Sequence, residues 1–335
     1  MQHTNNFRYK HYIAIDWSIK TVEIARMTYQ GSEIERRSIE SKVRTVKDYL
    51  NGLRGSKILT IEETTGSHWL YVELYEHVDK IIICDPYRNR LLSEGPKNDK
   101  IDAEKLCILL RSGLLKEVYH SLEHSYNMRK LVKAYEQLVN AGVRVKNQRS
   151  AVYRGMGLNH KKDGLNREDK LMEFVELQQQ RSIRQYVEEK CNYEKVFEQI
   201  RKEQKVIKQL TAISGIGTIL AMKIYSIVVD ATRFENKYKY WSYCGLVSHM
   251  KESGGRNYGR REPRYCRTLK GVYRSAALAA ISGNNDIREY YDELIKRSYS
   301  PREAANQIAR YIAKATYAVM KNKIPYRAYQ WRESR

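Results

Sequence analysis

The stretch H-Y-I-A-I-D-W-S, residues 11–18, decides the fold of the first part of the chain. It is a short apolar run rich in isoleucine, and such a run is typical of a buried strand. Residues 21–29 and 33–41 follow it and alternate apolar and polar side chains with a period of two, so they predict two half-buried strands. The chain is therefore expected to begin with three strands.

Helices and strands alternate after these three strands. The apolar spacing predicts two further strands and three helices, the strands at residues 57–62 and 80–85 and the helices near residues 43–53, 69–78 and 99–115. Three leading strands followed by alternating helices and strands predict an α/β domain with a mixed sheet, consistent with a ribonuclease-H-like fold. We place this domain at residues 9–118.

The character of the sequence changes between residues 120 and 210. No proline occurs there, and apolar residues recur at steps of three and four, which predicts long amphipathic helices. The segment from Gly155 to Gly164 is the expected loop of a helical hairpin. We assign residues 119–208 to a helical linker, either a solvated spacer or a coiled-coil arm that joins two copies of the chain.

The last third, residues 209–330, is predicted to be a mostly helical domain. At its start, Ser214-Gly215-Ile216-Gly217 separates two apolar helical stretches and resembles a helix-hairpin-helix element. Glycines at such a turn let a phosphate approach the N-terminus of the following helix, so Gly215 and Gly217 are candidate nucleic-acid contacts. The alternative is a turn that only packs two helices together.

Positive charge dominates the composition. The chain has 61 Lys and Arg against 39 Asp and Glu, a formal net charge of +22, which predicts a nucleic acid as partner. Residues 249–274 are strongly basic with tyrosines between the charges, as is typical of a nucleic-acid contact. Arg264, Arg267 and Arg274 fall at helical steps and would share one face. The candidate contacts in this segment are Arg256, Arg260, Arg261, Arg264, Arg267, Lys270 and Arg274.

Composition also excludes several classes of protein. No apolar run approaches the roughly 18 residues that a membrane-spanning helix needs, and the first residues lack the apolar core of a secretory signal. The cysteines are scattered singly without C-x-x-C pairs, so neither a disulfide framework nor a zinc site is expected. We expect a cytoplasmic protein with reduced thiols and no membrane partner.

Four carboxylates stand out by their positions. Asp16 lies inside the first apolar strand, Glu63 directly follows the strand at 57–62, and Asp99 and Asp102 share one face of a predicted helix. The carboxyl ends of adjacent strands meet at one edge of an α/β sheet, so these side chains could converge there and hold Mg²⁺. The alternative is ordinary roles as helix caps and turn residues.

Several motifs together resemble one family of proteins. They are I-A-I-D-W-S, E-T-T-G-S-H-W, D-P-Y-R followed by K-N-D-K-I-D-A, I-S-G-I-G, F-E-N with Y-C-G-L, S-G-G, and N-N-D-I-R-E-Y-Y. In this order, over residues 11–326, they are similar to those of the insertion-sequence transposases with a DEDD quartet. That family includes the Piv-type DNA invertases and the bridge-RNA-guided recombinases.

The resemblance implies a fold, an activity and partners. It implies a RuvC-like domain of the ribonuclease-H fold whose acids Asp16, Glu63, Asp99 and Asp102 bind Mg²⁺, with Mn²⁺ as a substitute. A coiled-coil linker and a C-terminal transposase domain would follow. The implied activity is DNA strand cleavage and exchange, with a structured guide RNA choosing the sites. The resemblance also implies a homo-oligomer, a dimer or a tetramer, associated with the nucleoid of a prokaryotic cell.

One position departs from the family pattern. Family members carry a nucleophilic serine in a G-x-I-S-K-x-G stretch, and counting back from N-N-D-I-R-E-Y-Y puts Glu262 at that slot. Thr268 is our nucleophile candidate, with Ser253 and Ser275 as alternatives, and each hydroxyl would need activation. Two other functions therefore stay open: a RuvC-like nuclease that uses activated water, and an inactive relative that only binds DNA or RNA.

Overall fold

The computed structural model describes two compact units, residues 1–123 and 124–335, which are treated separately below. The described residues are 9–31, 33–86, 99–122, 125–161, 163, 170–261 and 264–328. The three-part division with boundaries near 119 and 209 stays a prediction. Among the described residues, no helix has both the length and the apolar character needed to cross a bilayer.

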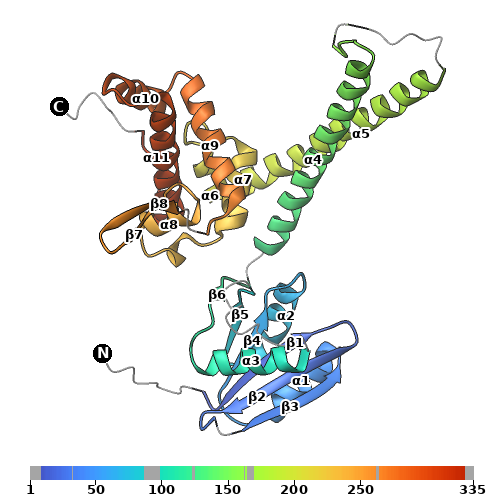
Figure 1. The fold of residues 1–335 in the computed structure, drawn as a ribbon, viewed down its shortest axis with the longest axis vertical. Helices are drawn as coiled ribbons and strands as arrows, with labels where there is room; N and C mark the ends of the chain where they lie inside the picture. Colours follow the sequence, from blue (N-terminus) through green and yellow to red (C-terminus); the bar gives the residue numbers. More distant parts are fainter. Residues whose placement is uncertain are drawn as a thin grey trace. The chain divides into compact units, whose positions relative to one another are not determined.

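The first unit is built on a six-stranded mixed sheet in the order β3-β2-β1-β4-β5-β6 (Figure 1). β1 lies at the centre, antiparallel to β2 and parallel to β4, and β4 is parallel to β5. β3 and β6 pair antiparallel at the two edges. The strands are β1 (His11–Trp17), β2 (Thr21–Thr28), β3 (Ile34–Glu40), β4 (Lys57–Glu62), β5 (Lys80–Cys84) and β6 (Glu117–Val118).

Each face of this sheet is covered by helices, and the period of two divides the strand residues between the faces. Ile13 and Ile15 of β1 pack into the core on the side of α1 (Val43–Gly52) and α2 (Ser67–Leu74). Tyr12 and Ala14 pack on the other side, against α3 (Asp99–Arg111). A 3-10 turn, Tyr75–His77, follows α2. β1 therefore contributes to two cores at once.

Two hydrogen bonds show in which direction α3 runs relative to β1. The Cys107 thiol donates to the Tyr12 carbonyl at 3.3 Å, near the start of β1. At the end of α3, Arg111 Nη2 donates to the Tyr29 carbonyl at 3.2 Å, beyond the β2 residue that pairs with His11. The helix therefore runs antiparallel to β1, and its N-terminus lies at the carboxyl end of that strand.

The sequence predicted most of this unit. The predicted α/β class is confirmed, and the predicted strands and helices lie within a few residues of the observed ones. β6 was missed because two residues, Glu117 and Val118, are too few to show a period.

The second unit is mostly helical, as predicted. Its first two helices form a long antiparallel pair, here called the helical arm: α4 (Ser125–Gly155) and α5 (Lys170–Glu203) (Figure 1). Val132 and Tyr135 of α4 and Phe197 of α5 belong to the same apolar core as the remaining helices. Those are α6 (Lys205–Leu210), α7 (Thr218–Val228), α8 (Lys237–Tyr243), α9 (Arg267–Ser282), α10 (Asp286–Lys296) and α11 (Pro301–Asn322), with a 3-10 turn at Ala231–Arg233.

The basic segment is a β-hairpin followed by a helix, which corrects one prediction. β7 (His249–Ser253) pairs antiparallel with β8 (Arg256–Arg261), and Gly254 and Gly255 turn the chain at φ +56° and +73°. Glycine accepts this left-handed backbone without steric cost. Because α9 begins only at Arg267, Arg264 precedes the helix. The expected common helical face of Arg264, Arg267 and Arg274 is therefore wrong for Arg264.

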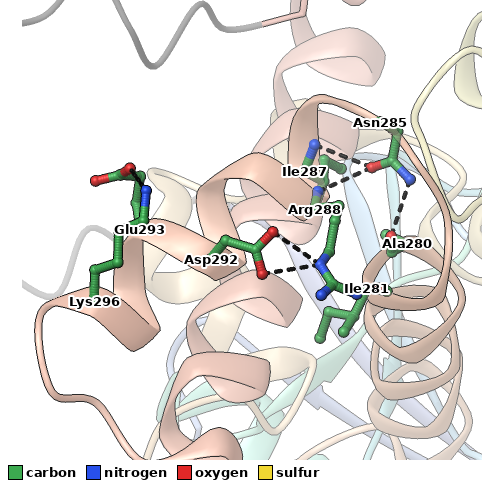
Figure 2. Close-up of polar contacts among 8 residues, drawn as sticks. All are labelled: Ala280, Ile281, Asn285, Ile287, Arg288, Asp292, Glu293 and Lys296. Atoms are coloured by element: carbon green, nitrogen blue, oxygen red, sulfur yellow. Dashed lines mark hydrogen bonds and ion pairs between the residues drawn. The ribbon is translucent and has the colours of Figure 1, made fainter.

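The motif N-N-D-I-R-E-Y-Y forms the junction between α9 and α10 (Figure 2). The Asn285 side-chain oxygen accepts hydrogen bonds from the backbone N–H groups of Ile287 and Arg288, each at 3.1 Å. Its amide nitrogen donates to the Ala280 carbonyl at 2.9 Å, at the end of α9. Asn285 thus caps one helix and ties it to the preceding one.

The side chain of Arg288 strengthens this junction. Its Nε donates to Asp292 one turn further along α10, at 2.9 Å, and its Nη1 donates to the Ile281 carbonyl of α9 at 2.6 Å (Figure 2). The charge of Arg288 therefore forms contacts within the second unit.

Replacing the cap should destabilise this unit measurably. We expect Asn285→Ala to lower the free energy of unfolding by about 1–2 kcal/mol, because two N–H groups of α10 lose their acceptor. The neighbouring Asn284 is exposed, so Asn284→Ala should change stability by less than about 0.5 kcal/mol. Urea unfolding of the two variants measures the difference, and equal midpoints would contradict the capping role.

Candidate active site and nucleic-acid interface

Asp16 lies at the carboxyl end of β1 on the side of the sheet that α3 covers. Tyr12 and Ala14 pack against α3, and Asp16 is the next residue in that alternation. Its partner in the β1–β2 register is Glu23, which is buried and accepts a hydrogen bond from the Ser38 hydroxyl at 2.7 Å. Side chains opposite each other in an antiparallel pair share a face, so two carboxylates are neighbours here.

Asp102 lies at the same end and on the same side of the sheet. It is half-buried in the first turns of α3, one turn before Leu106, which packs on the sheet. Cys107 of α3 contacts Tyr12, and Asp102 lies five residues before Cys107, which is about 7.5 Å along the helix axis toward its N-terminus. Asp16 lies four residues after Tyr12, which is about 13 Å along β1 in the same direction. Both residues are therefore displaced toward the same edge of the sheet, as their predicted convergence requires.

Asp99 is the first residue of α3, so its backbone lies at this same edge. The side chain of Asp99 falls outside the described part of the structure. Its place in the predicted quartet stays a prediction.

The second predicted acid, Glu63, lies beyond the end of β4 and is exposed. Its N–H donates to the Cys84 carbonyl at 3.0 Å, so the β4–β5 ladder continues by one residue. In this ladder Glu62 pairs with Cys84, which packs on the α3 side. Alternation therefore puts Glu62 on the face of Asp16 and Glu63 on the opposite face.

Glu62 is a further candidate beside Glu63, the acid predicted from the sequence. Ile58 packs on the α3 side of the sheet, and a count in steps of two from it leads through Thr60 to Glu62. The E-T-T-G motif indicates Glu63, whose place in the quartet stays a prediction.

The donor set at this edge fits a hard divalent cation. Asp16, Glu62, Glu63 and Asp102 offer only carboxylate oxygens, which Mg²⁺ prefers. Among the side chains that the structure describes, no three of His, Cys, Asp or Glu are gathered closely enough to hold a metal ion. The side chain of Asp99 is not among these, so the predicted four-acid set stays a prediction.

The candidate nucleophiles differ in their surroundings. Thr268 is the second residue of α9 and is half-buried, whereas Ser253 at the end of β7 and Ser275 on α9 are exposed. Glu262, which occupies the family's serine slot, lies outside the described residues. Two residues before Thr268 lies Cys266, and burial raises the pKa of its thiol, so it stays protonated at neutral pH.

The hairpin β7–β8 presents the first group of predicted nucleic-acid contacts. Arg256, Arg260 and Tyr258 are all exposed, with 62% of Tyr258 accessible. The backbone of Arg261 ends β8, and its side chain lies outside the described residues. A two-stranded ribbon of this kind has the width to enter the major groove of DNA.

The start of α9 presents the second group. Arg267, Lys270 and Arg274 fall at steps of three and four along the helix and line a cavity of about 300 Å³ together with Tyr265 and Gly271. Lys270 Nζ lies 4.3 Å from the centre of the Tyr265 ring, a cation–π contact. Three cations around one cavity favour binding of a phosphate.

The I-S-G-I-G turn packs the second unit together. Gly215 has φ +86°, and a Cβ built on it would lie 2.2 Å from the Ala276 carbonyl oxygen of α9. The Ser214 hydroxyl donates to Asp286 at 2.8 Å at the start of α10. Packing therefore accounts for Gly215 without a ligand.

Gly217 directly precedes α7, where a phosphate contact was predicted. A carboxylate already lies beside this helix end, because the Thr218 hydroxyl donates to Glu198 at 2.9 Å. Phosphate contact by Gly215 and Gly217 stays a prediction, and the packing alternative has direct support.

Comparison with known proteins agrees with this organisation. Residues 13–156 match a DEDD transposase model of the IS110 type, described as "Transposase", and residues 207–292 match the "Transposase IS116/IS110/IS902 family". Both descriptions are of transposases, so the class is that of the insertion-element transposases. Within that class the chain is similar to the IS110-type transposases, and it matches their DEDD model and their second model in that order.

A curated relative points the same way. It is the "Insertion element IS110 uncharacterized 43.6 kDa protein" of Streptomyces coelicolor (strain ATCC BAA-471 / A3(2) / M145), 29% identical over 114 residues. The match covers 34% of this chain and 28% of the relative, so the chain aligns with only about a quarter of that protein's length.

Proposed function

We propose that the chain cleaves and exchanges DNA strands as a transposase or site-specific recombinase, using carboxylates at the carboxyl edge of its first sheet. The observation that supports this is the position of Asp16 at the carboxyl end of β1, on the face covered by α3, the helix that carries Asp102 in its first turns. The strand order, with β1, β2 and β3 antiparallel and β1, β4 and β5 parallel, supports a ribonuclease-H-like, RuvC-like domain.

Asp16, Asp99, Asp102 and one of the two glutamates after β4 would hold the metal. Bound Mg²⁺, or Mn²⁺ in its place, would polarise the scissile phosphate and stabilise charge on the leaving oxygen. The cations of the α9 cavity and the exposed hairpin β7–β8 would hold the DNA backbone. Thr268 is the proposed nucleophile, and its hydroxyl would require a base to accept its proton.

An oligomer and a guide RNA are part of this proposal. Strand exchange joins several DNA ends, so more than one active site is needed. The helical arm offers exposed apolar side chains for a contact between copies, among them Leu171 with 78% and Phe174 with 62% of their surface accessible. The net charge of +22 favours binding of a structured RNA as well as of DNA.

A second candidate function is a nuclease that uses activated water. It is favoured by the position of Thr268, which is half-buried and lies at the very start of α9. A recombinase with a hydroxyl nucleophile leaves a covalent protein–DNA adduct, whereas hydrolysis leaves none. Denaturing gels of the reaction with labelled DNA separate the two.

The proposed function is tested by Mg²⁺-dependent cleavage of DNA from the element's ends, with and without RNA transcribed from the flanks. In this assay Glu62→Gln should reduce the cleavage rate by at least about 100-fold, because it removes a charge on the face of Asp16. Glu63→Gln should reduce the rate by less than about 5-fold, since that side chain is exposed on the other face.

The exposed Glu76, in the turn after α2, provides a matched control, and Glu76→Gln should leave the rate unchanged. A large loss with Glu63→Gln and none with Glu62→Gln would restore Glu63 as the second acid. Cleavage that proceeds equally in EDTA would overturn the metal-dependent proposal.

A further inference from the structure

A cavity of about 790 Å³ opens beside the proposed carboxylate site, on the α2 side of the sheet. It lies between the turn that joins β1 to β2 and the loop that joins β4 to α2. Its lining includes Trp17, Ile19, Lys20, Thr64 and Trp69. Trp17 directly follows Asp16, so the cavity begins one residue from a proposed metal-binding acid.

Two indole rings form the wall of this cavity. Trp17 and Trp69 meet edge to face, with ring centres 5.5 Å apart and planes at 85°. Trp17 packs on the core that contains Ile13 and Ile15, which fixes its ring. Trp69 keeps 44% of its surface accessible, and Ile19 across the cavity keeps 96%. A large aromatic surface is thus held firmly and left open to solvent.

The remaining lining suits a nucleotide. Lys20 is exposed in the β1–β2 turn, and among the described residues it takes part in no ion pair. Hydroxyl side chains of Ser18, Thr21, Thr64 and Thr65 complete the rim. A flat apolar wall with a cation and hydroxyls beside it complements a nucleobase and its phosphate, and the chain's charge favours a polyanion.

We propose that the cavity between Trp17 and Trp69 binds an unstacked base of the DNA strand that is being cut, with its ring on the indole of Trp69. Because Trp17, which lines the cavity, directly follows Asp16, the occupant is a nucleotide next to the scissile phosphate. The assignment to the cut strand rests on the proposed function, whereas the stacking itself does not. Stacking there holds the strand in place while the neighbouring phosphate lies at the acids.

The test compares two single-stranded DNA probes of equal charge, dT12 and an abasic 12-mer, bound to the full-length protein in EDTA. Fluorescence anisotropy gives both dissociation constants. The wild type should bind dT12 about 10-fold more tightly than the abasic strand, because each stacked base contributes to affinity. Trp69→Ala and Trp69→Leu should lose most of this preference, whereas Trp69→Phe should keep it within about 3-fold.

Tyr75 is as exposed as Trp69, at 44%, and lies outside the cavity, so Tyr75→Ala should keep the full preference. An unchanged preference in Trp69→Ala, or one retained in Trp69→Leu, would overturn stacking. A Trp69-dependent preference for the ribonucleotide U12 over dT12 would overturn the assignment to DNA. Because binding is measured without metal or cleavage, this proposal and the metal-dependent function fail independently.

Discussion

Asp16→Asn is expected to reduce DNA strand cleavage by at least about 1,000-fold while the protein stays folded. Asn keeps the size of the side chain and removes its charge. Asp16 lies at the end of the central strand, on the face that α3 covers, and Asp102 lies in the first turns of α3. A neutral amide is a poor ligand for Mg²⁺ compared with a carboxylate.

Stability separates loss of chemistry from loss of fold in this variant. Asp16 is paired in register with the buried Glu23, and like charges directly opposite each other destabilise a sheet. Asp16→Asn should therefore leave the thermal midpoint unchanged or raise it. Asp48→Asn, on the exposed side of α1, is the matched control and should retain cleavage. Cleavage by Asp16→Asn at the wild-type rate would show that the acids have been assigned wrongly.

Gly215→Ala should destabilise the second unit by at least about 3 kcal/mol. The backbone at Gly215 has φ +86°, which a residue with a Cβ adopts only under strain. The added Cβ would also lie 2.2 Å from the Ala276 carbonyl oxygen, and a backbone atom cannot move aside like the end of a side chain. α9 would have to shift away from the turn.

Gly217 gives the matched control for this prediction. Its φ is −84°, and a Cβ built there meets nothing within 4 Å. Gly217→Ala should change the free energy of unfolding by less than about 1 kcal/mol. Urea unfolding monitored by circular dichroism measures both variants, and similar midpoints for the two would show that the turn is not held by packing against α9.

The segments that bury the most apolar surface were predicted best from the sequence. The strands at 11–17 and 57–62 were predicted closely because their alternation is imposed by two cores. The hairpin β7–β8 was missed, since exposed charged residues show no period. The sequence shows the glycines of this hairpin, but it does not show that their φ angles are positive.

The candidate site was predictable to a similar extent. Asp16 and Asp102 could be proposed because a carboxylate inside an apolar strand is unusual and one in the first turns of a helix lies near the strand ends. The choice between Glu62 and Glu63 depends on a register that differs by one residue, which no motif specifies. The cavity at Trp17 and Trp69 is lined by side chains that are 52 positions apart in the sequence, so only the folded chain brings it together.

The alternation along β1 has a consequence for how this protein can change during evolution. Asp16 and Trp17 are neighbours in the chain but serve opposite sides of the sheet. An insertion or deletion of one residue within the strand would exchange the charge and the indole between those sides. A change of length in β1 would therefore affect the proposed metal site and the proposed base-stacking cavity at the same time.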